Sequence, residues 1–262
     1  MELKDKVFAV TGAGAGIGRA TALELIARGS KVAAVDLSEE GLRGTERLAG
    51  GTLSVHPLDI TDRDAVLALP DQVIAAHGQI DGLVNIAGII QPFVHLKDLE
   101  FERIERVMDV NFWGTVNTVK AFLPGLLTRP EASLVNVSSM GAILPVPGQT
   151  AYGASKAAVR LLTEGLYAEL QGTGVHVTEV FPGAVGTEIT KNSGVELAGA
   201  GRGEAAAKTT SPAEAARVIA DAIAQNRFRV HIGKDAKLFD RLSRLIPQRA
   251  IRMIAERMKD IA

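Results

Sequence analysis

Short apolar, β-branched segments alternate with longer segments of helical spacing along most of this 262-residue chain. The longer segments, such as 17–28 and 152–170, are typical of helices that cover one face of a sheet. Strand, helix and strand in repetition predict right-handed βαβ units, and therefore an α/β fold with a doubly wound parallel sheet. The short segments lie at 7–10, 32–35, 53–55, 83–86, 134–137, 175–181 and 230–232. We therefore expect about seven strands, with helices on both faces.

Composition narrows the class of protein. No linker or repeat divides the chain, so we expect a single domain over residues 1–262. A net charge of −1 gives no general attraction to nucleic acid. The chain has no cysteine, which excludes disulfides and a cysteine nucleophile and is compatible with a reducing cytosol. The first apolar run is too short for an export signal, so a cytoplasmic location is expected.

Two segments depart from the alternation. Residues 188–211 are rich in Gly, Ala and Ser and have weak periodicity, which predicts a mobile loop or short helices over a substrate site. Residues 235–262 carry apolar positions at helical spacing on either side of Pro247, which predicts a C-terminal extension of amphipathic helices.

A glycine-rich turn, TGAGAGIGRA, follows the first strand directly. Glycines at 12, 14, 16 and 18 allow a sharp turn and keep side chains away from a pyrophosphate, while the helix that starts near Ile17 points its N-terminus at it. The spacing fits G-x-x-x-G-x-G and not the more usual G-x-G-x-x-G. A nucleotide site is expected here, although a tight connection alone would also explain the turn.

Asp36 ends the second strand, 18 residues beyond Gly18. A carboxylate at this point accepts hydrogen bonds from the ribose hydroxyls of an adenosine and repels a 2′-phosphate. The following residues, Leu37 and Ser38, offer no positive charge. The sequence therefore favours NAD over NADP, the alternative being that Asp36 only caps the next helix.

Tyr152 and Lys156 lie four positions apart in YGASK and share one helix face. Small residues between them leave room for a flat ligand. A phenol ordinarily titrates near pH 10, and a neighbouring ammonium lowers that pKa by favouring the phenolate. The pair predicts a usable acid and base near neutral pH.

Read together, the motifs resemble the short-chain dehydrogenase/reductase family over nearly the whole chain to about residue 233. Their order is specific to that family, whereas each motif alone is common. Its implied fold is a Rossmann-type sheet. The resemblance rests on TGAGAGIG at 11–18, Asp36, Asp59, NIAG at 85–88, Asn111, VNVSS at 135–139, YGASK at 152–156 and PGAVGT at 182–187.

The resemblance implies four catalytic positions. Tyr152 would give or take the proton on the substrate oxygen, and Lys156 would lower its pKa and bond the nicotinamide ribose. Ser139 would hold the substrate oxygen, whereas Ser138 is less suited because consecutive strand residues face opposite ways. Asn111 would support a water-mediated proton path to Lys156, unless it is a polar residue that kinks its helix and is satisfied by backbone, and both roles are compatible.

The resemblance also implies how an NAD cofactor is held. Asp59 would meet the adenine amino group, unless it only caps the next helix, and Ile86 departs from the family's usual N-N-A-G. The segment from Pro182 to Thr187 would wrap the nicotinamide. Cofactor-binding positions are Gly12, Gly14, Gly16, Ile17, Gly18, Asp36, Leu37, Asp59, Ile60, Asn85, Ala87, Gly88, Tyr152, Lys156, Pro182, Gly183, Val185 and Thr187.

The implied reaction is hydride transfer between NAD(H) and a secondary alcohol or ketone, with no metal. Three alternatives remain: an epimerase or dehydratase that uses the same site, an NAD-binding sensor, and a membrane-associated binding protein with little turnover. By the same resemblance we expect a homodimer or homotetramer. The expected substrate pocket is apolar, which favours a hydrophobic substrate, and it is lined by Ile89, Ile90, Phe93, Ile143, Leu144, Val146 and Ile189.

Three roles are open for the C-terminal extension. It could pack against its own domain or a sister subunit, cover the substrate site as a hydrophobic lid, or contact an anionic membrane surface. The charge favours none of them alone: from residue 236, seven Lys or Arg stand against three Asp or Glu.

Overall fold

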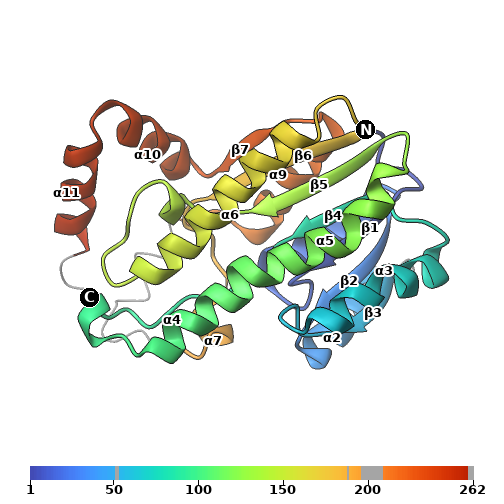
Figure 1. Cartoon of the computed structure of the whole chain (residues 1–262), viewed down its shortest axis with the longest axis horizontal. Coiled ribbons are helices and arrows are strands. Elements are labelled where there is room, and N and C mark those ends of the chain that lie inside the picture. Colours follow the sequence, from blue (N-terminus) through green and yellow to red (C-terminus); the bar gives the residue numbers. More distant parts are fainter. Residues whose placement is uncertain (51–52, 188, 196–208, 259–262) are drawn as a thin grey trace.

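Seven parallel strands form one sheet in the order β3-β2-β1-β4-β5-β6-β7 (Figure 1). The structure, a computed structural model, describes residues 1–50, 53–187, 189–195 and 209–258. The predicted α/β class and doubly wound parallel sheet are confirmed. The strands are β1 Val7–Thr11, β2 Lys31–Asp36, β3 Leu53–Pro57, β4 Gly82–Asn85, β5 Ala132–Val137, β6 Val175–Pro182 and β7 Arg229–Ile232.

Helices connect the strands and carry recognisable end signals. Ser38 and Asp62 accept a backbone N–H at the start of α2 and α3, and glycines with positive φ at 50 and 78 end the same two helices. The larger helices are α1 Gly16–Ala27, α2 Glu39–Ala49, α3 Arg63–His77, α4 Phe101–Met108, α5 Gly114–Leu127, α6 Thr150–Glu169, α9 Pro212–Ala224, α10 Lys234–Leu245 and α11 Pro247–Arg257. Short turns are η1 Leu96–Asp98, η2 Asp109–Trp113, η3 Met140–Ala142 and α7 Ile189–Asn192.

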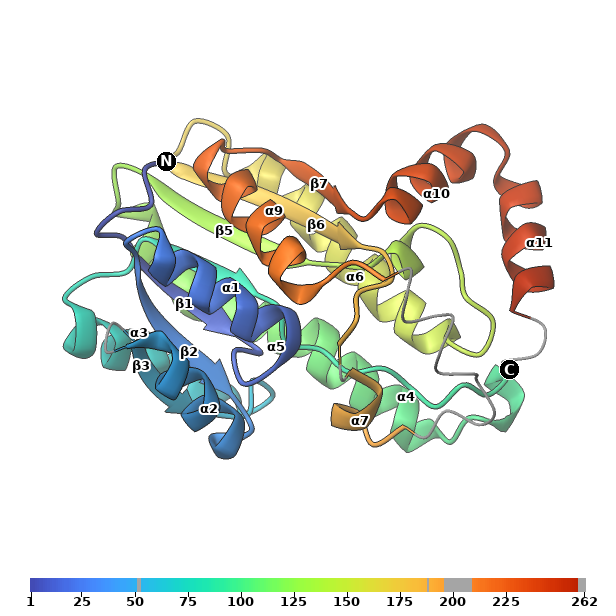
Figure 2. The ribbon, with the colours of Figure 1, turned by 180° about the vertical axis from the view of Figure 1, so that it is seen from behind.

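Two apolar layers lie on opposite faces of the sheet. On one face α1 and α9 pack on the strands around Val10, Val135 and Val180, as Figure 2 shows. On the other face α3, α5 and α6 pack around Leu83, Leu134 and neighbouring residues. Because both faces are covered, the inner strands β1, β4 and β5 are buried throughout, which explains their lack of polar alternation, whereas the edge strands β3 and β7 are only partly buried.

The strand order reverses beside β1. From β1 the chain builds outward through β2 to β3, and then returns to place β4 on the other side of β1. Loops at the carboxyl ends of β1 and β4 therefore diverge, at the position that in open α/β sheets is the ligand-binding crevice. This edge of the sheet is where the glycine turn, Asp36 and the segment after Asn85 all lie.

The two irregular segments have different outcomes. Within 188–211 the structure describes the short helix α7 and a bridge between Val185 and Thr210, while most of the predicted loop lies outside the described residues. The C-terminal extension is present as α10 and α11. In the described part of the chain, no helix has the length and hydropathy needed to cross a bilayer.

Candidate active site

The glycine turn is bent at two positions that favour glycine. Gly12 has a φ of 71° and Gly16 a φ of 52°, both in the left-handed region. A Cβ on Gly12 would stand 2.9 Å from the backbone nitrogen of Ala87, and one on Gly18 would stand 1.9 Å from the carbonyl oxygen of Gly12. Ala15, at the N-cap of α1, gives that helix no side-chain cap. The turn therefore leaves a close-fitting backbone surface and a helix N-terminus, which together suit an anion.

Asp36 lies against the glycine turn. Its Oδ2 accepts a hydrogen bond of 2.9 Å from the backbone N–H of Gly14, and its Oδ1 accepts one of 2.8 Å from that of Ser38. A Cβ on Gly14 would stand 2.9 Å from the same Oδ2. Leu37 is exposed beside it. The structure thus fixes a carboxylate beside the turn.

Arg19 was missed in the sequence analysis, which looked for positive charge only after Asp36, although Arg19 stands at the end of the quoted turn TGAGAGIGRA. Its guanidinium donates to the carbonyl oxygens of Gly14 and Gly41, and its Nε donates to Thr45 Oγ1 at 3.0 Å. The signal was available, since Arg19 directly follows Gly18 on α1. Arg19 holds the turn against α2 and places one positive charge at this end of the crevice.

Asp59 and Ile60 follow β3. Asp59 Oδ1 accepts hydrogen bonds from Thr61 N and Oγ1 at 2.9 and 2.7 Å, and its Oδ2 lies 3.5 Å from Arg106. Burial raises the pKa of Asp59, but the bonds from Thr61 and the charge of Arg106 outweigh it, so the pKa is lowered. The alternative that Asp59 caps the next helix is wrong, because Asp62 is the N-cap of α3. Ile60 is buried.

Asn85 turns away from the crevice. It is 5 % exposed, its Nδ2 donates to Asn136 Oδ1 at 2.9 Å, and its Oδ1 accepts from Thr118 at 2.8 Å. The side chain therefore ties β4 to β5 and α5, and any contact of Asn85 with a cofactor is left to its backbone. The amides of Ile86 and Ala87 bond Thr11 Oγ1 at 3.0 and 3.2 Å.

Ser138 and Ser139 follow directly after β5 and make different contacts with α6. Ser138 Oγ is buried and donates to the carbonyl oxygen of Lys156 at 2.8 Å, which anchors α6 to the strand. Ser139 Oγ accepts from Gly141 N at 3.0 Å. A Cβ on Gly141 would stand 3.4 Å from Ser139 Oγ and 3.5 Å from Tyr152 Cε1, so the hydroxyl lies beside the phenol ring. Ser139 is therefore the serine that the structure brings to Tyr152.

Lys156 is buried beneath the site. It is 5 % exposed, and its Nζ donates to the carbonyl oxygen of Val137 at 3.1 Å. Burial lowers the pKa of the Lys156 ammonium to about 8. Both ends of the YGASK motif thus lie beside the carboxyl end of β5.

The pKa of Tyr152 differs from the expectation. Burial of the phenol raises its pKa above the ordinary value, and the hydrogen bond with Ser139 acts in the opposite sense but is smaller. The prediction that Lys156 lowers the pKa of Tyr152 is therefore wrong for the protein without a cofactor. The physical reason is desolvation, which a sequence pattern does not display.

Asn111 lies in η2, a π-helical turn over Asp109–Trp113. Its Oδ1 accepts from Ile89 N at 2.8 Å, and its Nδ2 donates to Ile89 O and to Ser155 Oγ, both at 2.9 Å. A Cβ on Gly88 would stand 3.0 Å from both Asn111 Oδ1 and Lys156 Nζ. Asn111 is thus satisfied largely by backbone, and it also lies beside Lys156.

The segment Pro182–Thr187 returns toward the glycine turn. Gly183 N donates to Ile232 O at 2.9 Å, and the side chain of Thr187 lies 3.3 Å from where a Cβ of Gly16 would stand. Ala184 N donates to Asp235 Oδ2 at 2.8 Å. Asp235, a residue that the sequence analysis did not single out, therefore shapes this segment from the first turn of α10.

Gln91 also escaped the sequence analysis. It is 1 % exposed, its Oε1 accepts from Tyr152 N at 3.0 Å, and its Nε2 donates to Gly148 O at 2.9 Å. Gln149 Nε2 in turn donates to Gln91 O at 2.7 Å. This buried pair fixes the first turn of α6, and with it the position of Tyr152.

Comparisons with known proteins agree with this geometry. The family model described as short chain dehydrogenase matches residues 6–197. SadH of Mycobacterium tuberculosis, which is named as an oxidoreductase, is 39% identical and is aligned over 96% of this chain and 95% of its own.

Two solved structures have the same fold. A short-chain dehydrogenase/reductase from Burkholderia phymatum, in complex with NAD, is 28% identical with a TM-score of 0.86 and covers 95% of this chain and 96% of its own. A short chain dehydrogenase from Burkholderia cenocepacia, in complex with NADP, is 28% identical with a TM-score of 0.81 and covers 97% of this chain and 99% of its own. With its glycine turn, Ser139, Tyr152 and Lys156 gathered at one sheet edge, this chain belongs to the short-chain dehydrogenase/reductase family of oxidoreductases.

Proposed function

We propose that this chain transfers a hydride between NAD(H) and a hydrophobic secondary alcohol or its ketone, with Tyr152 as the acid and base. The observation that carries the proposal is that Ser139 Oγ and the Tyr152 ring lie side by side next to Gly141, while Lys156 Nζ and Asn111 Oδ1 meet at Gly88. A hydroxyl and a phenol that lie side by side can both reach a single substrate oxygen.

Each residue has a defined part in the reduction of a ketone. Tyr152, whose raised pKa keeps it protonated at neutral pH, donates its proton to the carbonyl oxygen. Ser139 donates a hydrogen bond to the same oxygen and stabilises its developing charge. The Lys156 ammonium, with a pKa of about 8, replaces the proton of Tyr152, and solvent water that Asn111 helps to hold returns a proton to Lys156. Bound NAD(H) supplies or accepts the hydride at nicotinamide C4.

The cofactor preference is proposed from Asp36. Its carboxylate is held by two backbone amides, so it cannot turn away from an adenosine ribose without losing both hydrogen bonds. A fixed negative charge at this position opposes a 2′-phosphate. Arg19 lies nearby but already donates to two carbonyl oxygens and Thr45. These contacts favour NAD in this chain, although both cofactors occur among similar proteins.

The hydrophobic substrate is proposed from the residues after Gly88 and Gly141. Ile90 and Leu144 are buried within this region, and both belong to apolar segments next to the catalytic residues. A pocket lined by such residues binds the alkyl or ring surface of a substrate favourably.

Assembly into a homodimer or homotetramer belongs to the same proposal. Three large hydrophobic side chains, Phe101, Trp113 and Leu161, are 77%, 47% and 69% exposed on α4, η2 and α6. Apolar surface of this size on neighbouring helices favours burial against a second copy.

The test is a scan of hydrophobic ketones and alcohols by the absorbance of NADH, with two tyrosine variants. Tyr152→Phe is expected to lower kcat/KM at least about a hundredfold. Tyr167→Phe is the matched control, because Tyr167 lies on the same helix, is half-exposed and is the other tyrosine of the chain. Turnover that survives in Tyr152→Phe contradicts the proposed role, and tight NADH binding without turnover of any substrate favours a sensor.

A further inference from the structure

The two C-terminal helices form a hairpin that stands out from the sheet domain (Figures 1 and 2). We name residues 234–257 the C-terminal hairpin. Its inner side is packed: Ala236 is 1% exposed, and Ala250 and Ile254 form an apolar cluster with Leu144 of the loop after η3. Packing against its own domain, one of the three expected roles, is therefore present on this side, and the outer side needs its own explanation.

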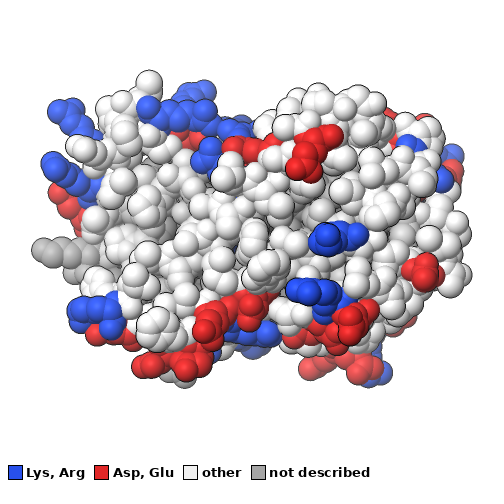
Figure 3. Space-filling view, in the orientation of Figure 1, with Lys and Arg blue, Asp and Glu red and all other residues white. Residues whose placement is uncertain are grey.

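The C-terminal hairpin concentrates positive charge. It holds seven Lys or Arg against three Asp or Glu, whereas the whole chain has a net charge of −1. The surplus of four means that the remaining residues sum to −5. Figure 3 shows Lys and Arg gathered over α10 and α11 on the left of the molecule. The protein is therefore strongly polarised, with its positive end on this hairpin.

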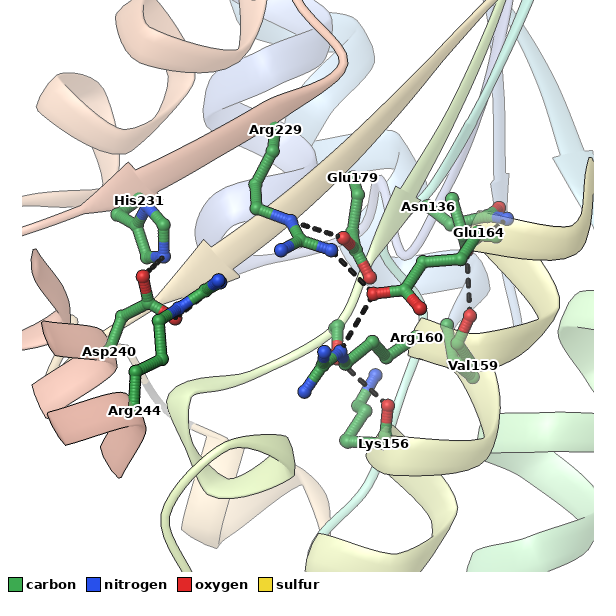
Figure 4. A network of polar contacts seen from close by, with 12 residues as sticks. Asn136, Lys156, Val159, Arg160, Glu164, Glu179, Arg229, His231, Asp240 and Arg244 are labelled. Carbon is green, nitrogen blue, oxygen red and sulfur yellow. Dashed lines mark hydrogen bonds and ion pairs between the residues drawn. The ribbon is translucent and has the colours of Figure 1, made fainter. Parts of the chain in front are cut away.

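Two of the three acidic side chains in the hairpin turn toward the domain. Asp235 accepts the backbone N–H of Ala184 at 2.8 Å. Asp240 is 15% exposed and lies between His231 and Arg244, at 3.5 and 3.1 Å (Figure 4). By this arrangement most of the negative charge of the hairpin is withdrawn from its outer surface.

The cations of the hairpin are largely unpaired. Five of them are exposed and make no ion pair with any residue that the structure describes; these are Lys234, Lys237, Arg241, Arg249 and Arg252. Unpaired basic side chains on one element are a surface that complements phosphate groups.

Large apolar side chains are exposed among these cations. Leu238 is 53%, Leu245 79% and Met253 45% exposed. Leu238, Arg241 and Leu245 follow one another at helical spacing, so they share a face of α10. A groove of about 420 Å³ runs between the two helices and is lined by Leu238, Phe239, Leu242, Met253 and Glu256. Apolar and cationic side chains are thus exposed next to one another along α10 and α11.

We propose that the outer side of the C-terminal hairpin is a docking surface for an anionic phospholipid bilayer. Leu238, Leu245 and Met253 enter the interfacial region of the bilayer, and Arg241, Arg249 and Arg252 meet the lipid phosphates. The inner side stays on Leu144, beside the proposed substrate loop. The inference goes beyond the proposed function and does not depend on it, since it concerns a surface outside the reacting groups.

Charge selects the bilayer over a second copy of the chain as the occupant. A second copy would bring its own four surplus positive charges to the same patch, and like charges repel. A surface that pairs with itself would need acidic side chains on its outer face. Two of the three acidic side chains of the hairpin instead turn toward the domain.

The experiment is flotation of the full-length protein with vesicles. Phosphatidylcholine vesicles are compared with vesicles that also contain phosphatidylglycerol, at low and high salt. The protein is expected to float with the anionic vesicles at low salt, and to remain below with neutral vesicles or at high salt, because salt screens exposed charges. Flotation with neutral vesicles alone, or with neither kind, overturns the proposal.

Paired variants locate the contact. Arg241→Glu with Arg249→Glu is expected to lower partitioning at least about a hundredfold, and Leu238→Ser with Leu245→Ser at least about tenfold. Matched controls are Arg47→Glu with Arg63→Glu, and Leu48→Ser with Leu67→Ser, which change exposed residues of α2 and α3. All four pairs lie outside the proposed catalytic machinery, so NADH binding reports that each variant is folded. Hairpin variants that float like the wild type overturn the proposal.

A measurement of mass in solution distinguishes the alternative occupant. If the hairpin variants dissociate an oligomer while the wild type fails to float with anionic vesicles, the surface joins copies of the chain and the bilayer proposal is wrong. If the variants keep the mass of the wild type and lose flotation, the bilayer contact is supported.

Discussion

Lys156 Nζ donates a hydrogen bond of 3.1 Å to the carbonyl oxygen of Val137, and thereby places a buried ammonium at the carboxyl end of β5. Ser138 Oγ makes the complementary connection by donating to Lys156 O at 2.8 Å. The strand and the catalytic helix are joined from both sides. A buried cation with one carbonyl partner is costly to fold and is retained for the reaction that we propose.

Lys156→Met is expected to stabilise the fold while abolishing turnover. The folded pKa of Lys156 is about 8, below the ordinary 10.5, so the folded state binds this proton less tightly than the unfolded state. The resulting cost is complete below pH 8 and fades as the pH rises to 10.5. The free energy of unfolding should therefore rise by up to about 3 kcal/mol at pH 7, and by much less near pH 10.

Urea unfolding at the two pH values measures this difference. Lys120→Met on α5 is the control, because Lys120 is exposed and its change should leave the free energy of unfolding nearly the same at both. A loss of stability in Lys156→Met at pH 7 would contradict the argument from burial.

Gly88→Ala is expected to lower activity with little loss of fold. The added methyl would stand 3.0 Å from both Asn111 Oδ1 and Lys156 Nζ, which must move apart to admit it. We expect kcat to fall at least about tenfold, because a small displacement of Asn111 and Lys156 slows the reaction. Steady-state kinetics and thermal unfolding are measured together, with Gly125→Ala as the control, because nothing lies within 4 Å of its added methyl.

That control has its own expected result. Gly125 lies inside α5, so alanine there should stabilise the helix by about 0.5–1 kcal/mol and leave kcat unchanged. Full activity in Gly88→Ala would show that Asn111 and Lys156 are not held in place at Gly88.

Glu179 predicts a dependence of stability on pH. Its side chain is fully buried in β6 and bonds Arg229 Nε at 2.8 Å (Figure 4). Burial raises the pKa of Glu179 to about 7, although the charge of Arg229 acts against it. Because the folded state holds this proton more tightly than the unfolded state, stability falls as the pH rises from 4.5 to about 7.

Glu179→Gln isolates this effect. Between pH 4.5 and 7 the wild type should lose up to about 3 kcal/mol relative to the variant, as measured by urea unfolding at several pH values. Glu169→Gln, at an exposed position of α6, should run parallel to the wild type. A constant difference between wild type and Glu179→Gln over this range would show that Glu179 is ionised throughout.

Asp36→Asn tests the choice of cofactor. Asparagine keeps one acceptor oxygen, which serves either Gly14 N or Ser38 N, and it carries no charge to repel a 2′-phosphate. The ratio of kcat/KM for NADH to that for NADPH should therefore fall at least about tenfold. Glu39→Gln, at the first residue of α2, is the control and should keep the ratio. An unchanged ratio in Asp36→Asn would mean that Arg19 and its surroundings, and not Asp36, decide between NADH and NADPH.

The strands could be predicted because their signal is local. Each apolar, β-branched run, such as 175–181, became a strand within about two residues of its predicted bounds. The glycine turn was also readable, since Gly12 and Gly16 carry the positive φ that the G-x-x-x-G-x-G pattern demands. Both features depend on residues that are close together in the sequence, so the sequence alone is enough to predict them.

The parts that escaped prediction depend on contacts between distant residues. Gln91 holds Tyr152 across 61 positions, and Asp235 holds Ala184 across 51. Neither has a pattern around it in the sequence. The raised pKa of Tyr152 belongs to the same group, because desolvation is set by how the whole domain packs over the phenol.

The π-helical turn Asp109–Trp113 holds one residue more than a regular helical turn would. Deleting a single residue from this stretch would close it into an ordinary α-helical turn. Asn111 would then lose the widened backbone that aims its amide at Ile89 N and O. The length of this turn, and not only the identity of its residues, therefore sets where the Asn111 amide lies.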